Sequence, residues 1–428
     1  MTELRQECLW EHVTPAAPTP VALASDIKAD VCVIGGGITG LSAAIHLLEQ
    51  GKRVVVLEAW QLGHGGSGRN VGLVNAGTWI RPDDVEVTLG EQQGSRLNKV
   101  LGEAPAEVFA MIKRYGIDCQ ARNEGTLHMA HNATGVADLQ ARHEQWTRRG
   151  ADVQLLTGAL CEEYCGTAKV STALLDRRAG TINPMGYTLG LGAAVTRLGG
   201  QIFQHSAVQG VERQGSHWCV KTAKGSVSAE KIVISTGAYT EGDWTDLQKH
   251  FFRGYYYQVA SAPLQGAAAD SVLKHGQGSW DTRTVLSSIR RDAQGRLLLG
   301  SLGRVDNKPS WFVRSWADRI QSHYFPQLGK IDWEMHWTGC IDFTPDHLMR
   351  LFEPAPGIVA VTGYNGRGNT TGTVIGKAFA QYLIEDKPEQ LPIPFSPMKP
   401  VAAAALRTGF YETGFSLYHA GQCLRVVL

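Results

Sequence analysis

Three glycines near the N-terminus form the first group of residues whose types and spacing predict chemistry. Gly35, Gly37 and Gly40 follow a short apolar run in the spacing G-x-G-x-x-G. In such a turn, the first glycine makes a tight bend, the second lets backbone approach a pyrophosphate, and the third lets a helix pack on a strand. The helix N-terminus, which here includes Ile38 and Thr39, then attracts phosphate charge. The motif predicts a dinucleotide site, and a purely structural glycine-rich turn is the alternative.

A carboxylate strengthens this interpretation. The next apolar run, 53–57, ends at Glu58, and Ala59 follows it. At the tip of a second strand, a carboxylate can accept hydrogen bonds from the ribose hydroxyls of an adenosine. A negative charge there disfavours a 2′-phosphate, which makes NADP a poor candidate. The motif by itself fits both NAD and FAD.

The stretch after Glu58 introduces a family resemblance. Residues 59–74, AWQLGHGGSGRNVGLV, closely resemble the FAD-dependent D-amino acid oxidase-like family. Within them, the segment G-G-S-G-R-N-x-G at 65–72 is similar to that family's gamma-glutamylputrescine oxidase and sarcosine oxidase branch. In the family this loop lines the pyrophosphate and the flavin ring, which implies contacts from residues at its centre. These residues are Ser67, Arg69, Asn70 and Val71.

Two middle segments resemble the nucleotide domain of the same family. The segment 180–212 is similar to the return of the chain into that domain, and its Val208 matches the position whose backbone meets adenine. The segment 229–240 matches the strand and turn that close the adenosine site, near Thr236 and Gly237. Taken alone, this second segment is equally well explained as an ordinary buried strand and turn.

A second glycine-rich turn, GYNGRGNTTG at 363–372, favours FAD over NAD. It lies within the segment 337–384, which resembles the strand, turn and helix that complete the family's flavin site. Glycines let backbone amides approach the flavin's pyrimidine edge, and the following helix N-terminus can stabilise negative charge there. A nicotinamide cofactor on a single Rossmann turn would not need a second such turn. The predicted contacts come from Gly366, Arg367, Gly368, Asn369 and Thr370.

One departure from the family bears on how FAD is held. In the sarcosine oxidase branch, a cysteine before the T-P-D segment carries the flavin covalently, and alignment on Thr344 gives Gly339 at that position. Cys340 is one residue away, and one step along a strand turns a side chain to the opposite face. We therefore predict non-covalent FAD next to Gly339, with Cys340 packed against its neighbours.

The predicted substrate contacts come from a hairpin and from several aromatic residues. The segment 285–301, VLSSIRRDAQGRLLLGS, resembles the family's substrate-domain hairpin, which implies that Arg290 faces the flavin. A guanidinium there could grip a substrate carboxylate by two parallel hydrogen bonds. A surface salt bridge is the alternative, and Arg291 could take its place.

Aromatic residues could form the rest of the pocket. The candidates are Tyr255, Tyr256, Tyr257, Trp280, Trp337 and, beside them, Arg253. Alternation along a strand sends Tyr255 and Tyr257 to one face and Tyr256 to the other. We assign Tyr255, Tyr257 and Trp337 to the catalytic pocket with Arg290, while aromatic packing within the sheet is the alternative for each.

Length and segment order predict two domains of an α/β fold. A chain of 428 residues exceeds the size of a single hydrophobic core. We expect a discontinuous Rossmann-type FAD-binding domain of the glutathione reductase and D-amino acid oxidase type, and a substrate domain with an antiparallel sheet. The expected ranges are 27–86, 180–245 and 335–386 for the first, 87–179 and 246–334 for the second, 1–26 for an extended N-terminal arm, and 387–428 for a tail packed on the body.

Charge and cysteine content exclude other classes of protein. The net charge of +1 is spread evenly, which disfavours a nucleic-acid partner. No targeting or membrane-spanning segment is expected from the sequence. The eight cysteines are scattered, and Cys161 and Cys165 fit helical neighbours better than metal ligands. We therefore expect a cytoplasmic protein with reduced thiols and no metal.

The resemblance implies an enzyme that oxidises the C–N bond of an amine by hydride transfer to flavin, followed by imine hydrolysis. A gamma-glutamylputrescine oxidase-like activity in polyamine breakdown is the first expectation. A D-amino acid or N-methyl amino acid oxidase or dehydrogenase is the alternative. The partners would be a small amine or amino acid and O2 or another electron acceptor. A flavin-holding electron-transfer subunit is a further alternative of a different class.

Overall fold

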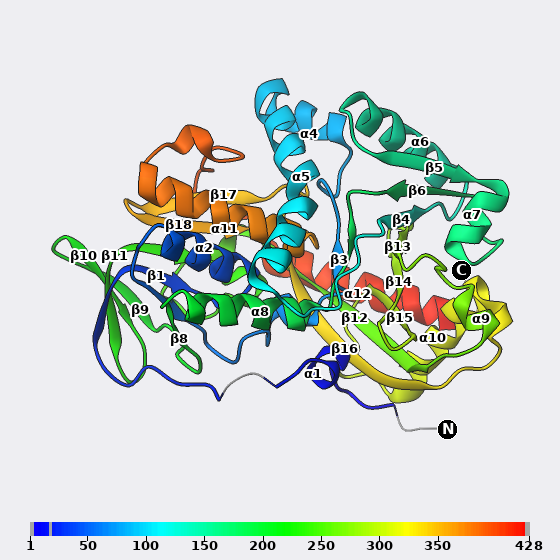
Figure 1. Cartoon of the computed structure of the whole chain (residues 1–428), viewed down its shortest axis with the longest axis horizontal. Helices are drawn as coiled ribbons and strands as arrows, with labels where there is room; N and C mark the ends of the chain where they lie inside the picture. The colour runs from blue at the N-terminus through cyan, green and yellow to red at the C-terminus, as the bar shows by residue number, and fades with distance from the viewer. Residues whose placement is uncertain (1–3, 17–18, 424–428) are drawn as a thin grey trace.

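Two large sheets, with helices packed around them, form the body of the protein. The computed structural model describes residues 4–16 and 19–423. One sheet lies beside the helices α2, α8 and α11, and the other lies beside α10 and α12 (Figure 1). This is the mixed α/β architecture predicted from the sequence.

The first sheet has a parallel core. Strands β8, β2, β1, β11 and β18 run parallel, while β17, β10 and β9 add antiparallel pairs at its edges. Its strands in spatial order are β17 (Arg350–Ala355), β18 (Ile358–Thr362), β11 (Ser226–Ile234), β1 (Ile27–Ile34), β2 (Val54–Leu57) and β8 (Gln201–Phe203), with β10 (His217–Lys221) and β9 (Gly210–Gln214) attached to β11. Parallel strands are apolar on both faces because both faces are covered.

The second sheet is antiparallel except for one pair. Strands β13 and β4 pair in parallel. All its other strand pairs are antiparallel, as predicted for the substrate domain. The strands in spatial order are β16 (Trp333–Phe343), β12 (Phe252–Pro263), β15 (Arg296–Leu302), β14 (Ser287–Arg291), β13 (Gly278–Asp281), β4 (Thr126–Met129), β6 (Thr172–Asp176) and β5 (Val153–Thr157). The predicted hairpin at 285–301 is present as β14 and β15.

Helices and a small third sheet complete the structure. The strands β3 (Leu73–Val74) and β7 (Gly180–Thr181) pair with each other. The α-helices are α1 (Leu9–Val13), α2 (Ile38–Glu49), α3 (Gly66–Arg69), α4 (Pro82–Leu89), α5 (Glu91–Tyr115), α6 (Ala133–Arg148), α7 (Gly158–Cys165), α8 (Pro184–Arg197), α9 (Ala267–Asp270), α10 (Ser310–Tyr324), α11 (Gly368–Glu385) and α12 (Ala404–Cys423). Four 3-10 turns in the described residues are η1 (Gly237–Tyr239), η2 (Leu247–His250), η3 (Pro326–Leu328) and η4 (Pro388–Gln390).

Small residues bring α2 and α11 into close contact. A Cβ added at Gly376 would come within 2.4 Å of the Thr39 carbonyl oxygen, and one at Gly372 within 2.8 Å of the Thr39 hydroxyl. The missing side chains let the two helices approach until their backbones nearly touch. Because both helices begin beside the same region, this packing sets the spacing between the two glycine-rich turns.

Two segments depart from the predicted division of the chain. Strand β16 belongs to the second sheet, although the predicted nucleotide segment begins at residue 335. The N-terminal arm is more than an extended segment, because Leu9 and Trp10 of α1 are fully buried against that same sheet. The division into two domains with these boundaries stays a prediction.

The C-terminal part of the chain returns to the body as α12. His419 bonds through Nε2 to the Leu302 carbonyl at 2.7 Å, which fixes the helix on the second sheet. Residues 424–428 of the predicted tail lie outside the described residues. Within 4–16 and 19–423, no helix combines the length and the apolar character needed to span a membrane.

Candidate active site

A cavity of about 540 Å³ runs from the glycine-rich turns of the first sheet to one face of the second sheet. This volume is within the range of ligand sites, about 300–1,000 Å³. At one end its walls are mainly loop and helix-start residues, and at the other they are mainly side chains of strands. The predicted cofactor residues that line it are Gly37, Ile38, Thr39, Ser67, Asn70, Val71, Thr236, Gly237, Gly366, Arg367, Gly368 and Asn369.

The first glycine-rich turn has the geometry that its spacing predicts. Gly35 has a φ of 103°, a conformation that favours glycine, and its amide donates to the Leu57 carbonyl at 2.8 Å. A Cβ at Gly40 would lie 2.1 Å from the Gly35 carbonyl oxygen. Helix α2 starts at Ile38, and its N-cap residue, Gly37, has no side chain to cap the helix. The Ile38 amide donates instead to Ser67 Oγ at 3.1 Å. The helix N-terminus therefore faces the cavity through backbone groups.

The second turn brings another helix N-terminus to the cavity. Helix α11 also begins without a side-chain cap. A Cβ at Gly368 would meet no atom within 4 Å, so this position borders open space. Asn369 and Asn70 exchange two side-chain hydrogen bonds at 2.9 and 3.0 Å, which join α11 to the end of α3. The two predicted loops thus form one continuous wall.

These features fit a dinucleotide such as FAD. Two helix N-termini beside one cavity, of which that of α11 has no side-chain cap, and a turn with an exposed backbone provide donors for phosphate and ring oxygens. Several buried polar atoms on the cavity wall, among them Tyr256 Oη, Gln258 Oε1 and Arg367 Nε, have no hydrogen-bond partner in the described chain. Buried polar atoms of this kind are normally satisfied, which indicates that a ligand completes them.

Three of the predicted adenosine contacts lie beyond this cavity, namely Glu58, Ala59 and Val208, whereas Thr236 and Gly237 line it. Glu58 accepts hydrogen bonds from the Gly36 amide at 2.8 Å and from the Trp60 amide at 3.0 Å. Ala59 is exposed and Val208 is half-buried beside the apolar core of the first sheet. The carboxylate is at the predicted strand end, and its contact with a ribose stays a prediction.

Two predicted cofactor residues support the wall from behind. Gly40 packs α2 on β1, and the Thr370 hydroxyl donates to the Arg367 carbonyl at 3.3 Å. Arg69 differs from the prediction. Its Nε donates to the His64 carbonyl at 2.8 Å and its guanidinium pairs with Glu11 at 3.3 Å, so it is directed away from the cavity. The predicted donation from Arg69 to phosphate or flavin is corrected.

The covalent-attachment position carries no side chain, as the alignment indicates. Gly339 pairs with Tyr256 across β16 and β12, and a Cβ at Gly339 would lie 2.2 Å from the Tyr256 hydroxyl. The tyrosine ring therefore occupies the space that a side chain at 339 would need. Cys340 is half-buried and contributes to the cavity wall, so it is not enclosed by its neighbours alone.

The predicted tyrosines lie on the wrong face of β12. Alternation along the strand holds, but Tyr256 lines the cavity, whereas Tyr255 and Tyr257 face away from it. Tyr257 is 1% exposed and packs edge-on against Trp316 of α10. The guanidinium of Arg304 lies 4.8 Å from the ring of Tyr255. The helices that cover this face of the sheet decide the orientation, and sequence alternation alone does not reveal which face they cover.

Arg290 and Trp337 are also corrected, because both bind the backbone of the loop behind the cavity. Arg290 is 2% exposed, and one of its terminal nitrogens donates to the carbonyls of Val71 at 2.8 Å and Ile182 at 2.7 Å. The indole nitrogen of Trp337 donates to the Arg69 carbonyl at 2.8 Å. Neither side chain lines the cavity, so the guanidinium of Arg290 does not reach the space where a substrate carboxylate would bind.

Together with Trp10, these residues hold a row of consecutive carbonyls. Trp337 binds the carbonyl of residue 69, Trp10 that of residue 70 at 2.9 Å, and Arg290 those of residues 71 and 72. The guanidinium of Arg290 lies 5.2 Å from the ring centre of Trp10. These buried donors fix the 69–72 loop, whose other side borders the cavity.

The second-sheet end of the cavity contains residues that sequence reasoning missed. His128 on β4 stacks on Trp280 of β13 with ring centres 4.8 Å apart. Burial lowers the pKa of His128 well below its usual range, so the ring is neutral. Trp79, Tyr411 and Phe415 also line this end. They come from separate elements, and no local motif marks them.

Asp342 was also missed, although it lies in a segment that resembles the family. Its carboxylate accepts the Gly363 amide at 2.7 Å and the Tyr364 amide at 3.3 Å, which ties the second glycine-rich turn to β16. It is buried on the cavity wall, and burial raises its pKa to about 7. Its hydrogen bonds indicate that Asp342 holds the second glycine-rich turn in place.

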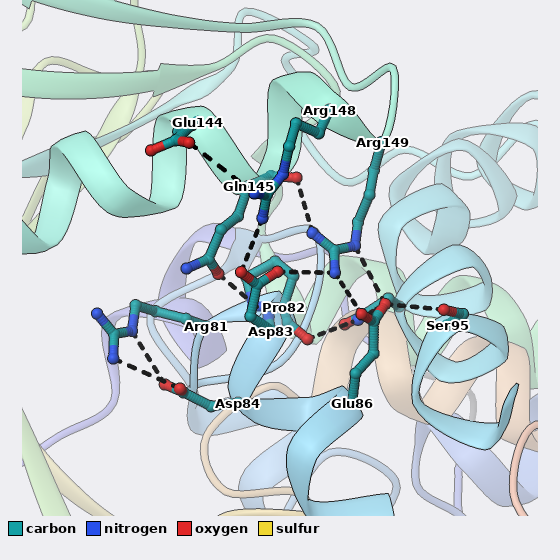
Figure 2. Close-up of polar contacts among 11 residues, drawn as sticks. Arg81, Pro82, Asp83, Asp84, Glu86, Ser95, Glu144, Gln145, Arg148 and Arg149 are labelled. Carbon is teal, nitrogen blue, oxygen red and sulfur yellow. Dashed lines mark hydrogen bonds and ion pairs between the residues drawn. The ribbon is translucent and has the colours of Figure 1, made fainter. Parts of the chain in front are cut away.

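An ion-pair network fixes the outer wall that carries Trp79. Arg149 at the end of α6 pairs with Asp83 at 2.8 Å and Glu86 at 2.7 Å, and Arg148 pairs with Asp83 at 2.7 Å (Figure 2). These contacts join α6 to α4, directly after Trp79. Because they are partly exposed, each pair contributes little, but the network orients the two helices.

Fold and site together define a class of protein. The model of the FAD dependent oxidoreductase family matches residues 30–382, and the chain belongs to this family. It is an enzyme whose cofactor is FAD.

Particular relatives sharpen this assignment. The chain is 32% identical over 372 residues to gamma-glutamylputrescine oxidoreductase of Escherichia coli K12, covering 85% of each chain. It is 30% identical over 368 residues to a probable oxidoreductase OrdL of Haemophilus influenzae, covering 84% of this chain and 83% of that one. The crystal structure of glycine oxidase from Geobacillus kaustophilus superposes with a TM-score of 0.71 at 20% identity, covering 87% of this chain and 99% of that one, and it shows the same fold.

Proposed function

We propose that the enzyme oxidises the C–N bond of an amine, with gamma-glutamylputrescine as the first candidate substrate. The observation that carries this proposal is a single cavity that joins two glycine-rich turns to an aromatic wall, formed by Tyr256, Trp280 and Trp79. The 32% identity to an Escherichia coli enzyme named for gamma-glutamylputrescine supports the substrate class.

The residues of the chain have distinct tasks in this proposal. Gly37, Ser67 and Asn70 would hold the dinucleotide at one turn, and Gly366 and Gly368 would meet the flavin at the other. FAD held by these residues would supply the hydride acceptor for the carbon next to nitrogen. Hydrolysis of the imine would then give a carbonyl compound and ammonia, or an amine where the nitrogen carries a substituent. The aromatic wall would exclude water and lower the pKa of a bound ammonium, which favours the neutral amine that can release hydride.

The proposal extends to how FAD is bound, where the enzyme works and what reoxidises it. Non-covalent FAD is supported by Gly339, which offers no side chain for attachment. Release of all flavin from acid-denatured protein is the expected result, and flavin that remains with the polypeptide would contradict it. Free thiols at the seven cysteines whose side chains are described fit a cytoplasmic location. O2 or another acceptor would take the electrons.

Anaerobic reduction of the bound flavin tests the function directly. The visible absorbance of the purified holoenzyme is followed after addition of gamma-glutamylputrescine, a panel of D-amino acids, or sarcosine. Rapid bleaching by gamma-glutamylputrescine alone is expected. Bleaching by the amino acids instead would support the second candidate, a D-amino acid or N-methyl amino acid oxidase or dehydrogenase. Absence of bleaching by every amine would contradict the enzyme proposal and favour an electron-transfer subunit.

A further inference from the structure

A neutral polar side chain of β12, Gln258, lines the second-sheet end of the cavity. It is 3% exposed and lies on the same face of the strand as Tyr256, two residues earlier. Its Nε2 is 3.5 Å from Ser288 Oγ, beyond the usual length of a hydrogen bond, and its Oε1 has no partner in the described chain. The side-chain carbonyl is therefore a buried acceptor on the cavity wall that lacks a donor.

The neighbouring strand leaves space for this side chain. Gln258 pairs with Gly300 of β15, and a Cβ at Gly300 would lie 2.0 Å from Gln258 Nε2 and 2.5 Å from Ser288 Oγ. The φ of Gly300 is not in the range that favours glycine, so the missing side chain is explained by space. The amide of Gln258 therefore lies against Gly300, and close packing fixes its position.

The chemistry of the wall indicates which donor fits Gln258 Oε1. A hydrogen bond from a reacting amine to this carbonyl would stabilise the ammonium form, which cannot release hydride. An amide N–H is neutral and keeps its proton throughout the reaction, so it suits a neutral acceptor. The Tyr256 hydroxyl on the same face also lacks a partner in the described chain, and it can donate to the carbonyl of such an amide.

We propose that Gln258 Oε1 accepts a hydrogen bond from an amide N–H of the substrate, so that the enzyme selects amines that carry a secondary amide over simple amines. A buried acceptor that a ligand leaves unpaired weakens binding of that ligand. This inference rests on the proposed amine oxidation and adds one recognition contact to it. Gamma-glutamylputrescine contains a secondary amide between its two parts, whereas putrescine and sarcosine do not.

Binding of unreactive ligands to the FAD-loaded enzyme tests this contact without turnover. The probes are the gamma-glutamyl amide of butylamine and the matching butyl ester, in which an oxygen replaces the amide N–H. Both lack the terminal amine that would be oxidised. They are titrated anaerobically at pH 7.5, with calorimetry and the visible flavin spectrum as readouts. Wild-type enzyme is expected to bind the amide at least about 10-fold more tightly than the ester.

Two variants and one control assign this preference to the acceptor. Gln258→Met keeps the length of the side chain and removes the carbonyl, so it is expected to bind both probes equally, with the flavin content of wild type. Gln258→Glu keeps an oxygen acceptor and should retain the preference. Gln277→Met is the matched control, because Gln277 is equally buried and also has an unpartnered Oε1, but does not line the cavity. It should retain the preference of wild type.

Three results would overturn the proposal. Equal affinities of the wild-type enzyme for amide and ester would do so without any variant, and would leave bound water as the partner of Gln258. An unchanged preference in Gln258→Met would assign the amide contact to another residue. Loss of the preference in Gln258→Glu or Gln277→Met, with flavin retained, would assign it to packing of the sheet. Lack of flavin reduction by every amine contradicts the proposed function, whereas these titrations address only the amide contact.

Discussion

The two ends of the cavity are built from different parts of the polypeptide. At the FAD end, backbone groups of two turns and two helix N-termini form the wall, and glycines such as Gly37 and Gly368 keep it accessible. At the substrate end, the wall consists of side chains from distant elements, such as His128 of β4, Tyr256 of β12 and Phe415 of α12. At the FAD end, a side chain added to a glycine would fill the space that the cofactor needs. At the substrate end, the lining side chains can move or be exchanged, which changes substrate specificity.

The largest expected effect is at the FAD end, at Gly40. In Gly40→Ala, the new Cβ would lie 2.1 Å from the backbone oxygen of Gly35, which has no room to yield. We expect loss of bound FAD and a fall of about 3 kcal/mol in the free energy of unfolding. Flavin absorbance after gel filtration and urea denaturation measure the two effects. Gly409→Ala on the exposed surface of α12 is the control, because no atom lies within 4 Å of its new Cβ. Retention of FAD by Gly40→Ala would contradict the expected intolerance of the FAD end to an added side chain.

Substitution of Arg290 tests how much the buried hydrogen bonds behind the 69–72 loop contribute to stability. Arg290→Met would leave the carbonyls of Val71 and Gly72 without this donor in a buried site. We expect a loss of about 2–3 kcal/mol in unfolding free energy, measured by urea denaturation. The rate of anaerobic flavin reduction by the amine substrate should not change, because Arg290 does not line the cavity. A selective loss of flavin reduction with unchanged stability would return Arg290 to the substrate site.

Substitution of Gly339 tests whether the substrate end tolerates an added side chain, because the new atom would contact a side chain and not the backbone. In Gly339→Ala, the Cβ would lie 2.2 Å from the ring of Tyr256, which can move aside. We expect a destabilisation of about 1–2 kcal/mol with FAD retained. Combining it with Tyr256→Ala should restore part of this loss, and a double-mutant cycle measures the coupling. Additive effects of the two substitutions would contradict the contact.

The smallest expected effect concerns Glu107, which ties together the helices behind the FAD end. Glu107 of α5 pairs with Lys377 of α11 at 2.8 Å and with His46 of α2 at 3.7 Å. The contact with His46, followed by the hydrogen bond from Lys377, lowers the pKa of Glu107 to about 2. A lowered carboxyl pKa stabilises the fold above the ordinary value, and this contribution is lost as the pH falls toward 2.

Glu107→Gln should therefore cost about 1 kcal/mol at pH 7 and progressively less below pH ~4. Urea denaturation at pH 7 and pH 3 compares the variant with wild type. Glu103→Gln, on the exposed side of the same helix, is the control and should match wild type at both pH values. A deficit of Glu107→Gln that stays constant between these pH values would contradict the assigned ion pair.

The two ends also differ in how far the sequence predicts them. The turns at Gly35 and Gly366 were predicted with their helices, because a φ of 103° or 80° and a close backbone approach require glycine locally. The substrate end was predicted poorly. The alternation of Tyr255, Tyr256 and Tyr257 was right and the face was wrong. Which face of β12 lies toward the cavity depends on α10 and α12, which cover the other face and are distant from β12 in the sequence.

The sequence alone determined the fold family, the two glycine-rich turns and the cofactor, because those features depend on backbone geometry encoded in short contiguous segments. Tertiary structure alone decided which of the predicted arginines lines the cavity. Arg290 and Arg367 are equally plausible as residue types. Only the packed structure gives the first a set of carbonyl partners and leaves the second unpaired in the cavity. Partner choice for a charged side chain is a long-range property, since burial and pairing are set by elements that meet only in the folded chain.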